Sequence, residues 1–204
     1  MMEWLIQLDR DIFLFINGLN NVSFDVIMWW VSGKITWWPF YTLLLVYFGW
    51  KRGWQLAPML LFIVIAITLT DQTSVHLFKN VFQRLRPCHE PALENLVHLV
   101  NNKCGGKYGF ISSHAANSFG VAILLSLWIG KRWFTLLMVS WAVLVGYSRI
   151  YLGVHYPGDV LAGGLWGAGC GWLVYRLFNL LIQRLPGTWW ITRNHQNTGS
   201  VSRS

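Results

Sequence analysis

The chain has 204 residues, of which 54% are hydrophobic and only 12% are charged. Soluble domains carry about 25% charged residues and cannot enclose so many apolar side chains in one core of this size, which excludes an ordinary cytosolic globule. The 14 Trp residues and a net charge of +8 that is scattered between apolar runs indicate an integral membrane protein and not a nucleic-acid-binding one.

Residues 1–19 form the first element, and its pattern has two interpretations. Glu3, Asp9, Arg10 and Asp11 interrupt the apolar residues at a spacing that leaves one apolar face. This spacing predicts an amphipathic helix in the membrane interface, with a sixth short span as the alternative. The segment lacks the basic start and the small-residue cleavage site of a signal peptide, so we expect it in the mature protein.

Five apolar runs follow, bounded by charged or Gly- and Pro-containing segments, and a helix needs about 20 such residues to cross the hydrocarbon layer. The first covers residues 35–50 and is expected to extend back through residues 26–33. The others are residues 56–78, 113–130, 133–147 and 160–181. The predicted fold class is therefore all-α, a polytopic transmembrane helical bundle over residues 20–185, and residues 186–204 are expected to form a polar cytoplasmic tail.

Basic residues at the ends of these runs predict the orientation of the bundle. Lys51-Arg52, Lys131-Arg132 and Arg184 fall on one side of a five-span arrangement, and the positive-inside rule places that side in the cytoplasm. Most of the remaining charge lies in segments 79–110 and 148–159, on the other side. We therefore expect the chemistry to face the periplasm or the outside.

A cationic pair lies at and beyond the end of the second run. Gln72, His76 and Lys79 recur at helical spacing, and Arg86 follows Lys79 by seven residues, which is the same face if the helix continues until Pro87 stops it. The two side chains would form a clamp for a dianion, since a guanidinium binds two phosphate oxygens and an ammonium acts as a point charge. Snorkelling to the interface is the alternative.

Two further polar groups come at helix ends. Ser112 and Ser113 open the third run with His114 in its first turn, and helix N-termini bind anions; a capped helix with an interfacial His is the alternative. His155 precedes Asp159 by about one turn, so the carboxylate is expected to hold one ring nitrogen and leave the other free to attack. A structural hydrogen bond at a helix start is the alternative there.

The order of these residues resembles the type 2 phosphatidic acid phosphatase (PAP2) family, with motifs Lys-x6-Arg-Pro, Pro-Ser-Gly-His and Ser-Arg-x5-His-x3-Asp. This chain has Lys79-x6-Arg86-Pro87, Ile111-Ser112-Ser113-His114 and Ser148-Arg149-x5-His155-x3-Asp159. Ile111 replaces the family's Pro, and Ser113 replaces its Gly. The added side chain at Ser113 puts the close approach of the backbone to phosphate in doubt.

The resemblance implies an enzyme, a metal-independent lipid phosphatase that works through a phosphohistidine. His155 would be the nucleophile, Asp159 would support it, and His114 would protonate the departing oxygen and then activate water. The implied phosphate-binding residues are Lys79, Arg86, Ser112, Ser113 and Arg149. No cofactor is expected, and the cations would repel a divalent metal ion.

The implied substrate is a lipid phosphate that enters sideways from the bilayer of a bacterial inner (cytoplasmic) membrane. Undecaprenyl diphosphate, phosphatidylglycerophosphate, phosphatidic acid and lipid A phosphate all stay open, as does the choice between monoester and diphosphate. The expected partners are this lipid and the bilayer, with no nucleic acid and no identifiable protein. A non-catalytic lipid-phosphate binding or transport protein is the alternative. Vanadate-dependent haloperoxidases share the motifs, but those enzymes are soluble and this chain has the composition of a membrane protein.

Two cysteines bound the largest outward loop, residues 88–104. In an oxidising periplasm a disulfide between Cys88 and Cys104 would order this loop by about 3 kcal/mol. Two free thiols are the alternative. Cys170 lies in the Gly-rich last run and is assigned no chemistry.

Overall fold

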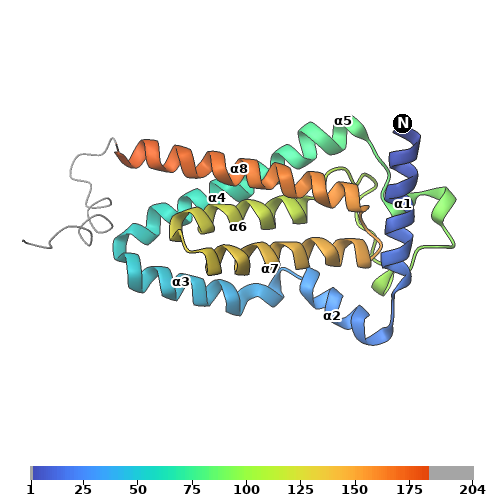
Figure 1. Ribbon diagram of the computed structural model, residues 1–204, viewed down its shortest axis with the longest axis horizontal. Helices are drawn as coiled ribbons and strands as arrows, with labels where there is room; N and C mark the ends of the chain where they lie inside the picture. Colours follow the sequence, from blue (N-terminus) through green and yellow to red (C-terminus); the bar gives the residue numbers. More distant parts are fainter. Residues whose placement is uncertain (1, 184–204) are drawn as a thin grey trace, which may run out of the picture.

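The computed structural model describes residues 2–183, and the predicted cytoplasmic tail lies outside these described residues. Long helices, labelled α3, α4, α6, α7 and α8, run side by side along a bundle, and α1 crosses one of its ends (Figure 1). The α-helices are α1 (Met2–Gly18), α2 (Val22–Ser32), α3 (Trp38–Arg52), α4 (Leu56–Thr73), α5 (Asn80–Phe82), α6 (Ser113–Ile129), α7 (Arg132–Tyr151) and α8 (Pro157–Gln183). The predicted all-α helical bundle is confirmed.

The bundle contains helical segments suited to crossing a membrane. Among residues 2–183, two segments meet the length and hydropathy requirements, Ile35–Phe82 and Arg132–Tyr151. The helices α1 and α2 meet at 116° and would be a third if this bent pair forms one span. The 48-residue run turns back on itself near Gly53, so that α3 and α4 are antiparallel (Figure 1). The expected five crossings stay a prediction.

The first expected span is wrong in its N-terminal extension. α2 ends at Ser32, and Gly33 adopts an extended conformation with φ −72° and ψ 132°, which separates α2 from α3. The indole Nε1 of Trp37 donates to the Val31 carbonyl at 2.8 Å. Because this side chain satisfies a carbonyl that the helix leaves unpaired, the break at Gly33 is stable.

α1 lies across the bundle end, close to the loops there. Phe13 is fully buried in its inner face. Asn17 donates to the carbonyls of His98 and Tyr151 at 2.9 and 2.7 Å, and its side-chain oxygen accepts from the His98 N–H at 2.8 Å. This transverse position supports the interfacial helix, which stays a prediction.

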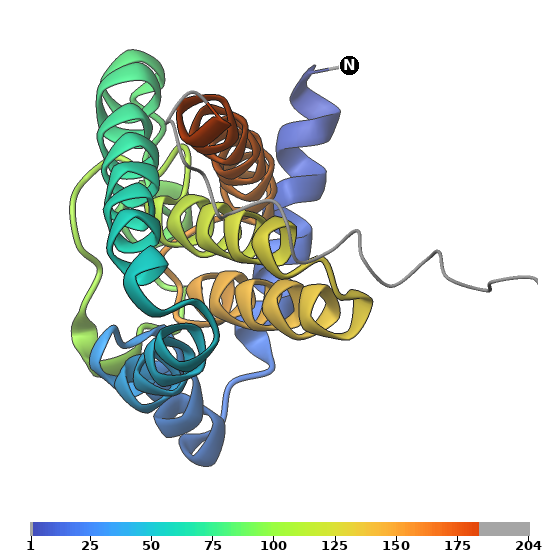
Figure 2. The ribbon, with the colours of Figure 1, turned by 90° about the vertical axis from the view of Figure 1, so that its left-hand side faces the viewer.

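Close packing between α6 and α8 positions the helix ends that matter for function. α6 contacts α4, α7 and α8 at the centre of the bundle (Figure 2). A Cβ atom at Gly163 would lie 2.6 Å from the Ser112 carbonyl, and one at Gly167 would collide with the Ala116 carbonyl. The small residues let the two backbones approach. The Ser112 N–H then donates to the Asp159 carbonyl at 2.9 Å, which joins the two N-termini.

Candidate active site

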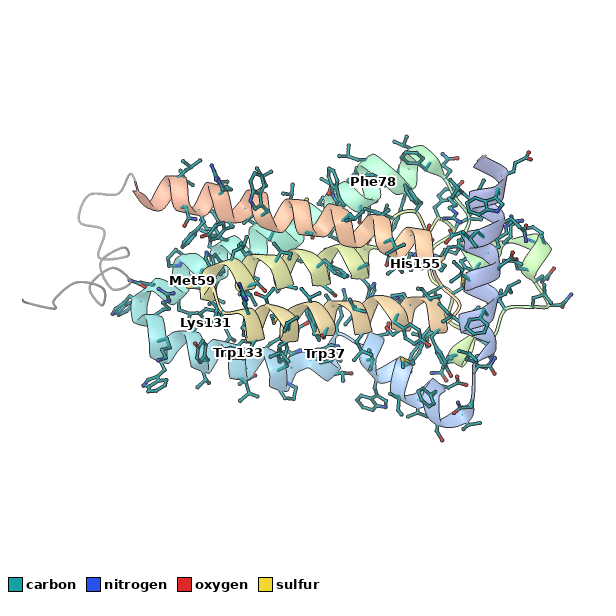
Figure 3. The ribbon with its side chains drawn as sticks, viewed as in Figure 1. Trp37, Met59, Phe78, Lys131, Trp133 and His155 are labelled. Carbon is teal, nitrogen blue, oxygen red and sulfur yellow. A yellow bond between two sulfur atoms is a disulfide. The ribbon has the colours of Figure 1, made fainter. Side chains whose placement is uncertain are left out.

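The predicted site residues gather at the bundle end that α1 crosses, where His155 lies (Figure 3). They come from separate parts of the chain: the turn after α7, the first turns of α6 and α8, the last turn of α7, the π-helical segment Ser74–Lys79 and the loop that follows α5. The direct contacts among them are described in turn below.

His155 is buried, with 1% of its surface exposed. Burial lowers its pKa well below the ordinary value, and Arg86, Arg149 and Lys79 lower it further. Nη1 of Arg86 lies 3.3 Å from Nε2 of the ring, and Oδ2 of Asp159 lies 3.5 Å from Nδ1. A guanidinium only donates, so Nε2 is the acceptor and the ring proton belongs on Nδ1, facing the carboxylate.

Asp159 is held by a residue that the motifs do not contain. Its Oδ1 accepts from Nη1 of Arg84 at 2.9 Å, and its Oδ2 accepts from the Tyr156 N–H at 3.1 Å. Nη2 of the same guanidinium donates to Oδ2 of Asp9 at 2.6 Å, and Oδ1 of Asp9 accepts from the Gly158 N–H at 2.7 Å. Arg84 therefore bridges α1 to the first turn of α8.

Sequence reasoning missed Arg84 and Asp9 as parts of the site. A signal for Asp9 was present, because it interrupts the apolar pattern of residues 1–19, and a charge in such a segment is expensive unless it has a partner. Arg84 lies two residues before Arg86, but the spacing of the family motifs does not include it. No local pattern pairs it with residues 75 positions away in either direction.

The expectation that one helix face carries both Lys79 and Arg86 is wrong. α5 ends where Gln83 adopts a left-handed conformation, φ 46° and ψ 29°. The chain then pairs Leu85 with Tyr108 in an isolated β-bridge, and this extended loop carries Arg86 to the site. The guanidinium donates to the carbonyls of Tyr108, Val154 and Cys104 at 3.3–3.5 Å. Burial lowers the pKa of Arg86, whereas the charge of Asp159 raises it.

Lys79 contacts the position where the family motif has Gly. Its Nζ donates to Oγ of Ser113 at 2.6 Å, and that hydroxyl also lies 2.6 Å from Oγ of Ser74. The substitution that puts the backbone contact in doubt therefore supplies a polar side chain beside the lysine. A hydroxyl there is able to contact a phosphate oxygen that Lys79 also binds.

The start of α6 combines a cap with free backbone donors. Ser112 is the N-cap, and its hydroxyl accepts from the Ala115 N–H at 3.4 Å. Among the described residues, no acceptor lies within hydrogen-bond distance of the N–H groups of Ser113 and His114. Helix N-termini with free N–H groups bind anions, so these donors suit phosphate oxygens.

Arg149, near the end of α7, has capacity left for an anion. Its Nη1 donates to the hydroxyl of Ser32, whereas its Nε is buried with no hydrogen-bond partner among residues 2–183. It lies within electrostatic range of Arg86 and His155. A buried donor without an acceptor costs free energy, which an anion bound at this position would recover.

A disulfide closes the loop of residues 88–104 next to Arg86. Cys88 and Cys104 form a disulfide with Cα atoms 6.0 Å apart, and the Cys104 carbonyl is one of the acceptors for Arg86. His89 lies near both sulfur atoms, but bonded sulfurs offer no thiolate to a metal ion. The loop thus contributes to the position of Arg86.

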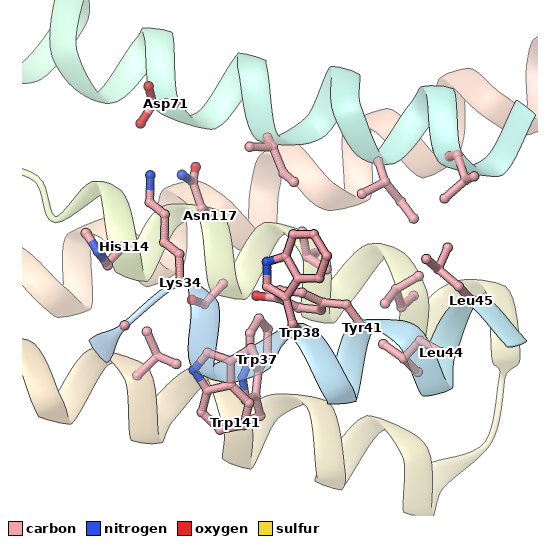
Figure 4. Close-up of a pocket in the computed structure, with 18 of the residues that line it drawn as sticks. Lys34, Trp37, Trp38, Tyr41, Leu44, Leu45, Asp71, His114, Asn117 and Trp141 are labelled. Carbon is pink, nitrogen blue, oxygen red and sulfur yellow. The ribbon is translucent and has the colours of Figure 1, made fainter. Parts of the chain in front are cut away.

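A cavity of about 530 Å³ leads from the site into the bundle between α3 and α4 (Figure 4). Ser113 and His114 line its polar end, and aromatic and aliphatic side chains such as Trp38, Tyr41 and Leu44 line the remainder. The imidazole of His114 makes no hydrogen bond with any described residue. An imidazole at the boundary between a cationic site and an apolar groove is suited to a substrate with a phosphate head and a lipid tail.

Comparisons with known proteins show which family and which solved fold this chain is similar to. Residues 55–183 match the PAP2 superfamily. A lipid A 4'-phosphatase of Bacteroides thetaiotaomicron is 39% identical over 91% of this chain and 83% of its own length, and an undecaprenyl-diphosphatase of Sulfolobus acidocaldarius is 31% identical over 84% and 79%. The crystal structure of Aquifex aeolicus LpxE superposes with a TM-score of 0.61 at 27% identity, covering 83% of this chain and 95% of that one.

These relatives confirm the predicted function class, phosphatases that act on lipid phosphates, over the non-catalytic alternative. The motif match over most of the bundle, together with the similar sequences and the similar fold, establishes that the chain belongs to the PAP2 superfamily.

Proposed function

We propose that the protein removes the 4'-phosphate of lipid A through a phosphohistidine at His155, without a metal ion. The relative with this activity by name is 39% identical over 91% of the chain, and it supports lipid A over the other lipid phosphates. The observation that carries the proposed chemistry is the buried His155 ring, with the Arg86 guanidinium 3.3 Å from one nitrogen and the Asp159 carboxylate 3.5 Å from the other.

The phosphate group occupies the cationic side of the His155 ring. In the free protein Arg86 donates to Nε2, so a phosphate that takes over this donor frees the lone pair of the nucleophile. Lys79, Arg149 and the N–H groups of Ser113 and His114 bind the remaining oxygens. These fixed donors stabilise the charge that spreads over the equatorial oxygens in the transition state.

The reaction has two steps. In the first, Nε2 of His155 attacks phosphorus, a P–N bond forms, and the P–O bond to the lipid breaks as His114 donates a proton to the departing oxygen. In the second, His114 takes a proton from a water molecule whose oxygen attacks phosphorus, and the P–N bond breaks. Inorganic phosphate leaves, and Asp159 stabilises the positive charge that the His155 ring carries between the steps.

The distribution of basic residues supports the periplasmic face of a bacterial inner membrane as the place of this reaction. Lys131 lies at the far end of the bundle from His155 (Figure 3), and Lys51 and Arg52 end α3 at that same end (Figure 1). The positive-inside rule assigns that end to the cytoplasm. The cavity between α3 and α4 then receives acyl chains from the outer leaflet.

Phosphate release from purified lipid A in detergent, measured with a chelator present, tests the proposal. The parent protein is expected to release phosphate, and His155→Ala is expected to lose activity by roughly four orders of magnitude or more, as for other nucleophile removals. His76→Ala, which removes an exposed imidazole without hydrogen bonds to described residues, is the matched control and should retain activity.

A trapping experiment identifies the intermediate. Substrate labelled on the phosphate should transfer the label to the protein in an acid-labile, base-stable form that is absent from His155→Ala. Activity that requires an added metal, or label that persists in His155→Ala, would contradict the mechanism.

A further inference from the structure

The cavity contains a second polar cluster that the proposed reaction does not use. Lys34, from the turn between α2 and α3, points across the cavity toward Asp71 of α4 and Asn117 of α6 (Figure 4). Ser113 and His114 line the same cavity. The cluster therefore adjoins the proposed phosphate-binding residues through the part of the cavity wall that Ser113 and His114 form.

The two charges in this cluster are exceptional for their surroundings. Within residues 2–183, no carboxylate lies within 4.0 Å of the Lys34 ammonium, and no cation lies within 4.0 Å of the Asp71 carboxylate. Neither side chain makes a hydrogen bond with a described residue. Most other side chains around them in the groove are aliphatic or aromatic. Charges in a membrane-spanning bundle are costly, and those that face a cavity mark the path of a polar ligand.

Asn117 completes the cluster, next to a hydroxyl that also contacts the carbonyls of Ala66 and Ile67. Its Oδ1 accepts a hydrogen bond from the hydroxyl of Thr70, which is fully buried in α4. Because Thr70 occupies the oxygen, the amide NH₂ group is left to donate toward the cavity. The cluster thus offers one anionic acceptor, Asp71, and two donors, Lys34 and Asn117, within a single face of the groove.

We propose that Lys34, Asp71 and Asn117 form a headgroup subsite that binds the hydroxyl and amide groups of a sugar on the leaving-group side of the scissile bond. This inference rests on the proposed function and deepens it. His114 protonates the departing oxygen, so the group that carries this oxygen lies beside His114 in the cavity, where the cluster is. A sugar hydroxyl donates to Asp71 and accepts from Lys34 or Asn117 at once.

The same cluster disfavours a prenyl diphosphate. The leaving group of that substrate is a lipid monophosphate, whose ionised oxygens only accept hydrogen bonds. Lys34 and Asn117 would find acceptors, but Asp71 would face an anion with no donor. Specificity arises from such unpaired groups as much as from good contacts, so Asp71 is the residue that selects the sugar.

Paired substrates test this subsite: lipid A and undecaprenyl diphosphate, each in detergent micelles, with phosphate release as the readout. Asp71→Asn should lower kcat/KM for lipid A by roughly tenfold to a hundredfold, the range for loss of a hydrogen bond to a charged group. The value for undecaprenyl diphosphate should stay unchanged or rise. Lys34→Gln should raise KM for lipid A more than it lowers kcat.

Asp11→Asn, which neutralises an exposed carboxylate on α1, is the matched control and should leave both substrates unchanged. An equal fall for both substrates in Asp71→Asn, or no fall for lipid A, would overturn the subsite while leaving the phosphatase activity intact. Failure of the proposed function has a different signature, no His155-dependent phosphate release from lipid A by the parent protein, and would overturn both.

Discussion

Replacing Arg84 with Gln removes the donor that holds the proposed catalytic carboxylate. Asp159 is fully buried, and Nη1 of Arg84 donates to it at 2.9 Å. Breaking a buried ion pair from one side costs about 3–5 kcal/mol, because the remaining charge is left unpaired. Arg84 itself is 27% exposed, so water partly replaces it. We therefore expect a loss of about 3 kcal/mol in the free energy of unfolding, at the lower end of that range.

The same substitution should reduce kcat by roughly a hundredfold in the fraction that remains folded, the cost of displacing a catalytic group by about 1 Å. KM should change less, because Arg84 is neither a proposed phosphate-binding residue nor a residue that lines the cavity. Arg84→Lys is expected to be intermediate, since one ammonium cannot bridge Asp9 and Asp159 with the two-pronged geometry of a guanidinium.

Thermal unfolding in detergent and phosphate release from lipid A measure the two effects. Arg10→Gln is the matched control: Arg10 pairs with Glu90 at 3.5 Å with both side chains partly exposed, so its loss should cost under about 1 kcal/mol and leave kcat unchanged. A loss of stability in Arg84→Gln equal to that of Arg10→Gln, or an unchanged kcat per folded molecule, would refute the assignment of Arg84 as a positioning residue.

Three further outcomes are expected. Gly167→Ala should lower the free energy of unfolding by about 1–3 kcal/mol, because the new Cβ atom would collide with the backbone of α6. Gly169→Ala is the control and should be neutral, because a Cβ atom there meets nothing within 4 Å. Thermal melting distinguishes the two variants. The double substitution of Cys88→Ser and Cys104→Ser should lower the free energy of unfolding by about 3 kcal/mol. It should also reduce kcat, because the Cys104 carbonyl that accepts from Arg86 is no longer held in place. Thiol titration verifies the disulfide, and an unchanged kcat would contradict the connection between the disulfide and Arg86. Burial lowers the pKa of His155, so below about pH 6.5 the unfolded chain binds more protons than the folded protein. The free energy of unfolding therefore falls as the pH is lowered. His155→Gln should flatten this decline in melting curves recorded from about pH 7 to pH 5.

Local sequence patterns were sufficient for the membrane class, the helical bundle and the motif residues. Apolar runs of about 20 residues have few stable structures other than helices in a bilayer, because every backbone group must be bonded within its own segment. Motif spacing likewise placed His155 one turn before Asp159 and Ser112 at the start of a helix, since both relations depend on a few consecutive residues.

Contacts between distant segments were beyond such patterns. The bridge from Asp9 through Arg84 to Asp159 joins three segments, and the route of Arg86 depends on the pairing of Leu85 with Tyr108. The cluster of Lys34, Asp71 and Asn117 forms across three elements in the same way. Spacing along a helix encodes which residues share a face, whereas the partner of that face depends on how whole helices pack, and that packing results from the sum of many weak contacts.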